Sequence, residues 1–195
     1  MNQNNERADA ARNRQAILDA ALALFAETND PATLTMNAVA EAAGVGKGTV
    51  FRRFGDRASL LRAVFDLQVD RAVQNIEYGP FPLGPDTPPI ERIVAILQTI
   101  VVLKLTNRSL TQAVEAIASS STSSPFVSKQ YSYIEEKLKI LLSELVPESE
   151  VIFTAHALLG ATRIDLLNYL TAQENMNDDE IRQGLEAFLL RVLKK

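Results

Sequence analysis

Two short helical segments joined by a three-residue turn constrain this 195-residue chain more than any other feature. The stretch from Leu34 to Leu61 reads LTMNAVAEAAGVGKGTVFRRFGDRASLL, and Ala43-Gly44-Val45 separates two runs with helical spacing of apolar residues. Glycine reaches the positive φ that so tight a turn needs, and the small Ala40 and Ala43 let the two helices approach closely. The pattern predicts a helix-turn-helix, in which the second helix enters the major groove of DNA.

The second of these segments, Lys47 to Phe54, has two different faces. Val50, Phe51 and Phe54 are spaced to pack inward, and the outward side chains are those of Lys47, Thr49, Arg52 and Arg53. Lysine and arginine bind phosphates or guanine edges, and threonine contacts phosphate or a thymine methyl group. Gly48 removes a side chain where a DNA backbone could come close. The alternative is a solvated helix of a bundle, which glycines near the start of the helix disfavour.

Charge is distributed unevenly along the chain, whose net charge is −4. Between Gly44 and Arg62, five basic residues accompany the single acid Asp56, which gives +4 over 19 residues. Three more arginines, at positions 7, 12 and 14, lie near the N-terminus. A local basic patch on an otherwise acidic protein is typical of a chain that touches DNA at one end only.

Composition narrows the class of protein further. Hydrophobic residues make up 47% of the chain, which is enough for a folded core. No uninterrupted apolar run approaches 18 residues, and the polar N-terminus is unlike a secretory signal, so we expect a cytoplasmic protein that does not enter a membrane. There is no cysteine, a single histidine, and no nucleotide-binding, zincin or hydrolase motif. We therefore expect no enzymatic activity, no catalytic residue, no metal and no cofactor.

The spacing of apolar residues predicts an all-α fold of about nine helices. The expected helices span residues 13–27, 36–43, 47–54, 57–76, 90–106, 109–118, 126–146, 148–176 and 179–194. We expect a flexible tail at 1–10, a three-helix DNA-binding domain at 11–56, and a helical ligand-binding and dimerisation domain at 57–195 that starts with a connecting helix, 57–76. The Pro/Gly-rich stretch 79–89 and the Ser/Thr run 119–124 are expected to be loops.

The segment from about Arg14 to Phe65 resembles the DNA-binding domain of the TetR family of bacterial regulators. The matching elements are AILDAALALF at 16–25, Thr33-Leu34-Thr35, VAEAAGV at 39–45, and GTVFRRF at 48–54 followed by Leu60. The resemblance implies that Thr35 caps the second helix and meets a phosphate. It also implies that Lys47, Thr49, Arg52 and Arg53 lie at or near DNA, and Gly48 and Phe51 complete the set of contact residues that we predict in this segment. Phe51 stands where the family often has tyrosine, so a hydroxyl that contacts phosphate is missing.

Beyond residue 65 the chain matches the family only in being helical and of the expected length. The resemblance implies that this domain binds a small-molecule inducer and dimerises through the last two long helices, which could form a four-helix bundle. The candidate interface residues, for which an intramolecular core is the alternative, are Phe153, His156, Gly160, Ile164, Leu167, Leu185 and Leu189. The candidate residues of the inducer pocket, each also explicable as plain core, are Ile96, Ile100, Leu103, Val114, Ile117, Tyr131, Ile134 and Leu138.

These features together predict a homodimeric, ligand-responsive DNA-binding regulator. The partners we expect are a double-stranded DNA operator with two-fold symmetry, a second copy of the chain and a small inducer. The apolar residues of the pocket favour a hydrophobic inducer that releases a repressor from its operator. The alternative functions are a helical protein-interaction module that no longer binds DNA and a non-specific DNA-packaging protein.

Overall fold

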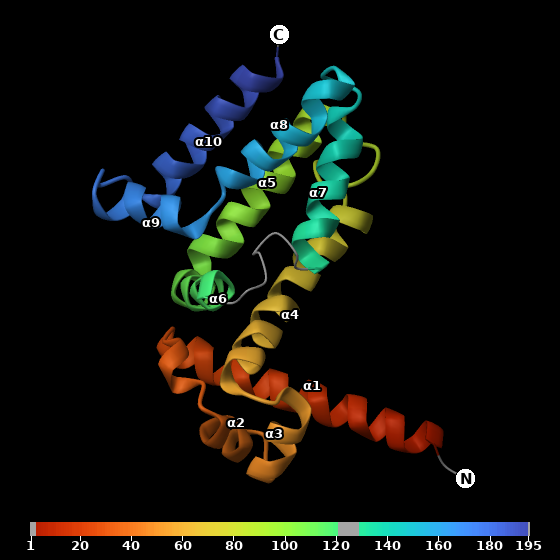
Figure 1. Ribbon diagram of the computed structural model, residues 1–195, viewed down its shortest axis with the longest axis vertical. Helices are drawn as coiled ribbons and strands as arrows, with labels where there is room; N and C mark the ends of the chain where they lie inside the picture. Colours follow the sequence, from red (N-terminus) through yellow and green to blue (C-terminus); the bar gives the residue numbers. More distant parts are fainter. Residues whose placement is uncertain (1–2, 121–128, 195) are drawn as a thin grey trace. The chain divides into compact units, whose positions relative to one another are not determined.

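The computed structural model describes residues 3–120 and 129–194, and the elements within these ranges are helices (Figure 1). They are α1 (Gln3–Thr28), the 3-10 helix η1 (Pro31–Thr33), α2 (Met36–Ala42), α3 (Lys47–Phe54), α4 (Arg57–Tyr78), α5 (Pro89–Thr106), α6 (Arg108–Ser120), α7 (Lys129–Leu142), α8 (Glu148–Gly160), α9 (Ile164–Ala172) and α10 (Asp178–Leu193). The expected all-α fold is confirmed, with ten α-helices in these ranges where the sequence suggested about nine.

The chain divides into two compact units. The N-terminal unit consists of Met1–Leu67 and Ser109–Ile117, and the C-terminal unit of Gln68–Arg108 and Ala118–Lys195. This division differs from the expected boundary after residue 56. The reason is that Leu60, Leu61 and Val64 of α4 are buried in the core of the N-terminal unit. The middle of α6 belongs to the same unit, because Leu110 and Val114 pack in its core. Local periodicity does not reveal a contact between residues so far apart in the sequence.

The first helix is longer than the sequence suggested. α1 begins at Gln3, so residues 3–10 continue the helix where a flexible tail was expected. Neither proline nor glycine occurs between Gln3 and Thr28, so no residue interrupts the helical backbone. Ile17, Leu18, Ala21 and Phe25 are buried, and their spacing places them on one face of the helix.

The predicted helix-turn-helix is present in the N-terminal unit. Gly44 has a φ of +64°, in the left-handed region that the tight turn requires. The Val45 N–H then donates to the carbonyl oxygen of Ala40 at 3.0 Å. Val39 of α2 and Val50 of α3 are fully buried in the same core. The turn and the shared core together fix the direction of α3.

The start of α4 is tied to the segment that precedes α2. The Arg57 side chain donates from Nε to the carbonyl oxygen of Leu34 at 3.1 Å and from Nη2 to that of Pro31 at 2.5 Å. Asp56 caps α4, because its carboxylate accepts a hydrogen bond from the Ser59 N–H at 2.7 Å. Hydrogen bonds from Ser59 hold the pKa of the Asp56 carboxyl below its usual value, so the cap stays ionised at a more acidic pH than a free aspartate does.

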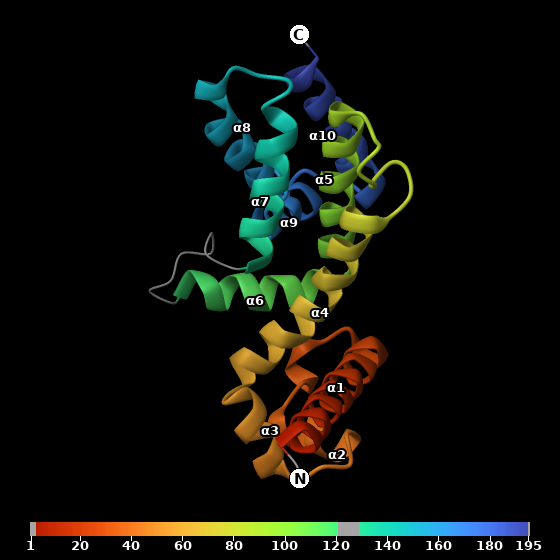
Figure 2. The same ribbon diagram turned by 90° about the vertical axis from the view of Figure 1, so that its right-hand side faces the viewer.

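The C-terminal unit is built around α5. This helix packs on α7, α9 and α10, and α7 packs on α8. Figure 2 shows α7 in front of α8 and α5 in front of α10. The core side chains that are fully buried include Ile76, Ile93, Ile96, Leu97, Val101, Leu138, Leu142 and Leu189. Because α5 is apolar on most of its surface, it can serve as the common neighbour of the other helices.

The expectation of one helix from 148 to 176 is wrong, because this stretch forms α8 and α9 with a break between them. Arg163, just before α9, has an extended backbone with φ −67° and ψ 140°. The buried Thr162 hydroxyl donates to the carbonyl oxygen of Leu159 at 2.8 Å, which offers the backbone a local alternative to the helical pattern. Gly160 at the end of α8 further lowers the helical propensity at this point.

Other boundaries differ less. The Ser/Thr run expected as a loop begins inside α6, which includes residues 119 and 120, and the rest of it lies outside the described residues. The helix expected at 126–146 is described as α7, which ends at Leu142; residues 126–128 also lie outside the described part. Among the described residues no single helix is long and apolar enough to cross a membrane, although the bent pair of α5 and α6 reaches that length and composition when taken together.

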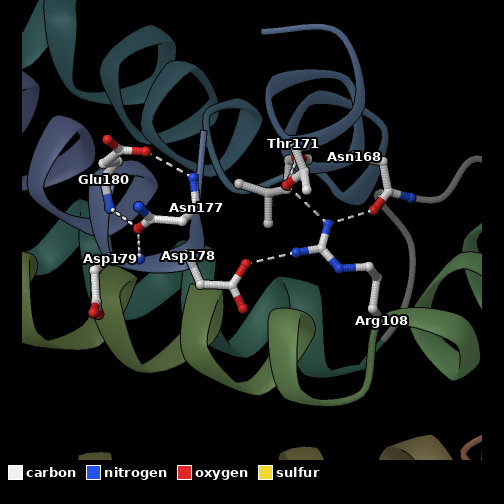
Figure 3. Close-up of polar contacts among 8 residues, drawn as sticks. Arg108, Asn168, Thr171, Asn177, Asp178, Asp179 and Glu180 are labelled. Atoms are coloured by element: carbon white, nitrogen blue, oxygen red, sulfur yellow. Dashed lines mark hydrogen bonds and ion pairs between the residues drawn. The ribbon is translucent and has the colours of Figure 1, made fainter. Parts of the chain in front are cut away.

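An arginine at the start of α6 connects three helices, as Figure 3 shows. Arg108 donates from Nη1 to Asn168 Oδ1 at 2.8 Å and to Thr171 Oγ1 at 3.2 Å, both on α9. Its Nη2 lies 2.7 Å from Asp178 Oδ1 in the first turn of α10. Asn177 closes the same turn with a capping box, in which its side chain accepts the Glu180 N–H and the Glu180 carboxylate accepts the Asn177 N–H. One guanidinium thus joins α9 to the first turn of α10 within the C-terminal unit.

We predict that replacing Arg57 by alanine lowers the free energy of unfolding by about 1–2 kcal/mol, because it removes two hydrogen bonds from a charged donor at a partly exposed site. Arg57→Lys should recover little, since a lysine amine lacks the planar fork that reaches both carbonyl groups. Urea unfolding followed by circular dichroism measures the change. Arg53→Ala is the control, because the exposed Arg53 makes no hydrogen bond or ion pair within the described structure. An equal loss in both variants would contradict the role given to Arg57.

Candidate nucleic-acid interface

The eight residues of α3 divide into a buried and an exposed face. Val50 is fully buried and Phe54 is 8% exposed, so these two side chains anchor the helix in the core. The exposed residues include Lys47, Gly48, Arg52 and Arg53, with Thr49 half-buried. The structure therefore brings the predicted polar residues of 47–54 together on the outer surface of one helix.

Phe51 does not pack inward, and that part of the sequence interpretation is wrong. Its side chain is 41% exposed, and the Lys47 amine lies 5.7 Å from the centroid of its ring. The reason is geometric: Val50 and Phe54, four residues apart, point into the core, and Phe51 follows Val50 by 100° around the helix. Phe51 therefore lies on the surface beside Lys47, where a tyrosine hydroxyl would reach solvent or a phosphate.

Thr35 caps α2, as predicted. Its hydroxyl oxygen accepts a hydrogen bond from the Ala38 N–H at 3.1 Å, and the side chain is otherwise exposed. A threonine hydroxyl that accepts one hydrogen bond still has its own proton to donate. That proton is available to a phosphate oxygen at the N-terminus of α2, where the helix dipole also favours an anion.

The glycines at the start of α3 have no internal packing role. A Cβ atom built on Gly46 or on Gly48 would meet no atom within 4 Å, and Gly46 provides no side-chain cap for α3. The space next to both residues is therefore open on the outside of the unit. An external chain, such as a DNA backbone, can approach the α3 N-terminus closely there.

The cations of α3 are not neutralised within the unit. Lys47, Arg52 and Arg53 make no ion pair with any carboxylate in the described ranges. The nearest acid in the sequence, Asp56, is engaged as the cap of α4. Unpaired positive charge in a protein with a net charge of −4 marks this face as a site for an anionic partner.

The predicted pocket residues do not all come together. Val114 and Ile117 on α6 pack with the core of the N-terminal unit. The remaining residues belong to the C-terminal unit: Ile96, Leu138 and Ile134 are buried, and Ile100, Leu103 and Tyr131 are half-buried. The helical spacing of these apolar residues shows that they lie on the inward face of a helix. It does not show which core that face joins.

The predicted interface residues also separate into two groups. Four of them are at most 8% exposed within a single chain and are core residues, namely Ile164, Leu167, Leu185 and Leu189. Phe153 is 79% exposed, and Gly160 and His156 are partly exposed. His156 packs on α7, where its Nδ1 lies 2.8 Å from the Tyr131 hydroxyl and its Nε2 lies 3.5 Å from Glu135.

Two exposed apolar stripes lie beside those buried residues, and of their members Phe153 and Gly160 are among the predicted interface residues. On α8 the stripe comprises Ile152, Phe153, Ala157 and Gly160. On α10 it comprises Gly184, Ala187, Phe188 and Val192. Both stripes follow the helical spacing of three and four residues, but on a face next to the one that carries the buried residues. In the sequence, a second set of apolar residues with helical spacing on the same helix would have indicated these stripes.

Comparison with known proteins agrees with this geometry. Residues 17–64 match the family model of bacterial regulatory proteins of the TetR family. The chain is 32% identical over 122 residues to an HTH-type transcriptional regulator of Staphylococcus aureus, which covers 63% of each protein. It is 39% identical over 83 residues to the HTH-type transcriptional repressor LfrR of Mycolicibacterium smegmatis, which covers 43% of this chain and 42% of LfrR. The matched part is thus less than two thirds of either relative.

The likeness in fold extends over nearly the whole chain. A TetR transcriptional regulator from Streptomyces coelicolor superposes with a TM-score of 0.67 and 23% identity, covering 92% of this chain and 95% of that one. TetR-family regulators are DNA-binding proteins and not enzymes, which agrees with the expectation drawn from the motifs. The sequence match and the shared fold agree: residues 17–64, which include the helix-turn-helix, match the model of TetR-family bacterial regulatory proteins, and the chain has the fold of solved TetR regulators.

Proposed function

We propose that this chain is a transcriptional repressor that binds a two-fold DNA operator as a homodimer and is released by a small hydrophobic molecule. The observation that carries the proposal is the exposed face of α3, where three cations without carboxylate partners surround an open glycine. Bidentate arginine contacts to guanine and charge-assisted contacts to phosphate suit this set of side chains. That the regulator represses transcription is supported by the name of one relative, the repressor LfrR.

DNA binding is tested by titrating the protein into duplex from the region upstream of its own gene, beside unrelated duplex, at several salt concentrations. We expect preferential binding with a steep salt dependence, and footprinting should show a site with two-fold symmetry. Arg52→Ala should weaken binding about tenfold or more, the cost of a lost hydrogen bond from a charged donor. Arg71→Ala, an exposed arginine in the C-terminal part of α4, is the matched control. Absence of DNA binding would favour the interaction-module alternative, and equal affinity for all duplexes would favour packaging.

Position 51 gives a second prediction, in the direction of tighter binding. Phe51→Tyr should increase affinity by about two- to tenfold, because the exposed ring would gain a hydroxyl that can donate to a phosphate. The gain should be equal for operator and unrelated DNA, since phosphate contacts carry no sequence information. Fluorescence anisotropy measures both affinities. Phe81→Tyr, which adds the same hydroxyl to a 70% exposed phenylalanine of the C-terminal unit, should change neither.

The homodimer is supported by the two exposed apolar stripes. Ile152 is 64% exposed and Phe153 is 79% exposed on α8, and Phe188 is 42% exposed on α10. Exposed apolar side chains in a continuous patch mark protein contacts. The small residues Ala157 and Gly184 within the stripes allow helices of two subunits to approach closely. A two-fold arrangement of α8 and α10 with their copies would bury both stripes at once.

We predict that Phe153→Asp raises the dissociation constant of the dimer by more than about a hundredfold. Two-fold symmetry removes the apolar contact twice, and burial of each phenylalanine is worth about 1.5–3 kcal/mol. Sedimentation velocity over a range of protein concentrations measures the change. Ile140→Asp on α7 is the control, because this isoleucine is 53% exposed and lies outside the two stripes. A monomeric wild-type protein, or equal effects of both variants, would contradict the proposed interface.

The inducer site is proposed for the C-terminal unit, among the apolar side chains of α5 and α7. Ile100 and Tyr131 are partly exposed and pack against the core of that unit, so they can line a pocket for an apolar molecule. A ligand releases DNA only if it binds the released conformation more tightly than the DNA-bound one. Screening hydrophobic compounds for release of bound operator DNA tests this part of the proposal.

A further inference from the structure

We propose that Arg14 of α1 is an additional DNA contact, which binds a backbone phosphate beside the end of α3. The inference rests on the proposed DNA binding and extends the contact surface to a helix outside the helix-turn-helix. It requires three observations: where α1 leaves the core, what the Arg14 side chain touches, and how its charge is balanced.

Arg14 lies where α1 leaves the core of the N-terminal unit. The buried face of α1 begins with Ile17 and Leu18, and Arg14 precedes them on the same face by one helical turn. Figure 1 shows that the N-terminal part of α1 extends past α3. The position that would continue the apolar face is therefore occupied by an exposed cation.

The side chain of Arg14 is held against α3. Its guanidinium carbon lies 5.3 Å from the centroid of the Phe54 ring, and Phe54 is the last residue of α3. Arg52 and Arg53 belong to the same final turn. The contact with the ring face holds the guanidinium in one place without using its in-plane N–H donors. Arg14 thus adds a preorganised fork of donors next to the basic residues of α3.

The charge of Arg14 has no carboxylate partner in the described part of the chain. Two residues earlier, Arg12 pairs with Asp9 on the opposite face of the same helix. A purely structural cover for Phe54 would not need a charge, since an apolar side chain would bury the ring equally well. An unpaired, oriented guanidinium next to a DNA-binding helix instead fits an anion with two oxygen acceptors, which a phosphate supplies.

A phosphate is favoured over a base edge because Arg14 lies beside the end of α3 and projects from another helix. Side chains outside the recognition helix meet the sugar-phosphate backbone that borders the groove. Such a contact should strengthen binding to every duplex by the same factor. It should also add to the number of counterions released, about 0.9 in the slope of log K against log salt for each phosphate neutralised.

The test compares Arg14→Gln, Arg14→Lys and the control Arg12→Gln in the full-length protein, by fluorescence anisotropy with the operator duplex and an unrelated duplex at several salt concentrations. We expect Arg14→Gln to weaken binding to both duplexes by roughly tenfold and to reduce the salt slope by about 0.9 per bound subunit. Arg14→Lys should retain most of the slope because it keeps the charge, and Arg12→Gln should behave like the wild type.

The outcomes separate this inference from the proposed function. If the wild type binds no DNA, both are overturned. If the wild type binds and all three variants match its affinity and slope, only the role of Arg14 is overturned. Thermal unfolding of each variant distinguishes a structural role: a lower midpoint for Arg14→Gln with an unchanged salt slope would mean that the side chain only covers Phe54. Loss restricted to the operator duplex would assign Arg14 to a base edge and overturn the phosphate contact.

Discussion

Burial of Val50 and Phe54 is the interaction on which the DNA-contacting surface depends. A helix of eight residues is not stable by itself in water, because its few hydrogen bonds do not repay the entropy of nucleation. α3 therefore exists in a fixed direction only while these two side chains, each worth about 1.5–3 kcal/mol, are held in the N-terminal core. Because these two positions of α3 face the core, the helical geometry places Phe51, Arg52 and Arg53 on the surface. The charge pattern of α3 is thus a consequence of its packing.

Local signals in the sequence were enough to predict the fold class, the helix-turn-helix and several helix ends. Gly44 was identifiable because only glycine readily adopts the positive φ of the turn. Thr35 was identifiable because a short polar side chain before a helix can accept a hydrogen bond from one of its free N–H groups. Each of these features depends on residues within four positions of one another, which is the range over which sequence patterns carry structural information.

Features that depend on distant residues could not be predicted in this way. Periodicity shows that one face of a helix is apolar, but it does not show which core that face joins. Val114 was therefore grouped with residues of the other unit, and Leu185 was assigned to an interface although it is buried within its own chain. The Arg108 contacts join residues 60 to 70 positions apart, so no local pattern announces them. Phe51 was wrongly predicted to pack inward, because a short helix such as α3 buries only one narrow face.

The continuity of α4 gives the two units a common element. No proline or glycine interrupts Arg57–Tyr78, so the helix has no residue that would act as a hinge. Leu60, Leu61 and Val64 are buried in one core, and Ile76 is fully buried in the other. Arg57 at the other end is bonded to the segment preceding α2, which fixes the start of α4 within the N-terminal unit.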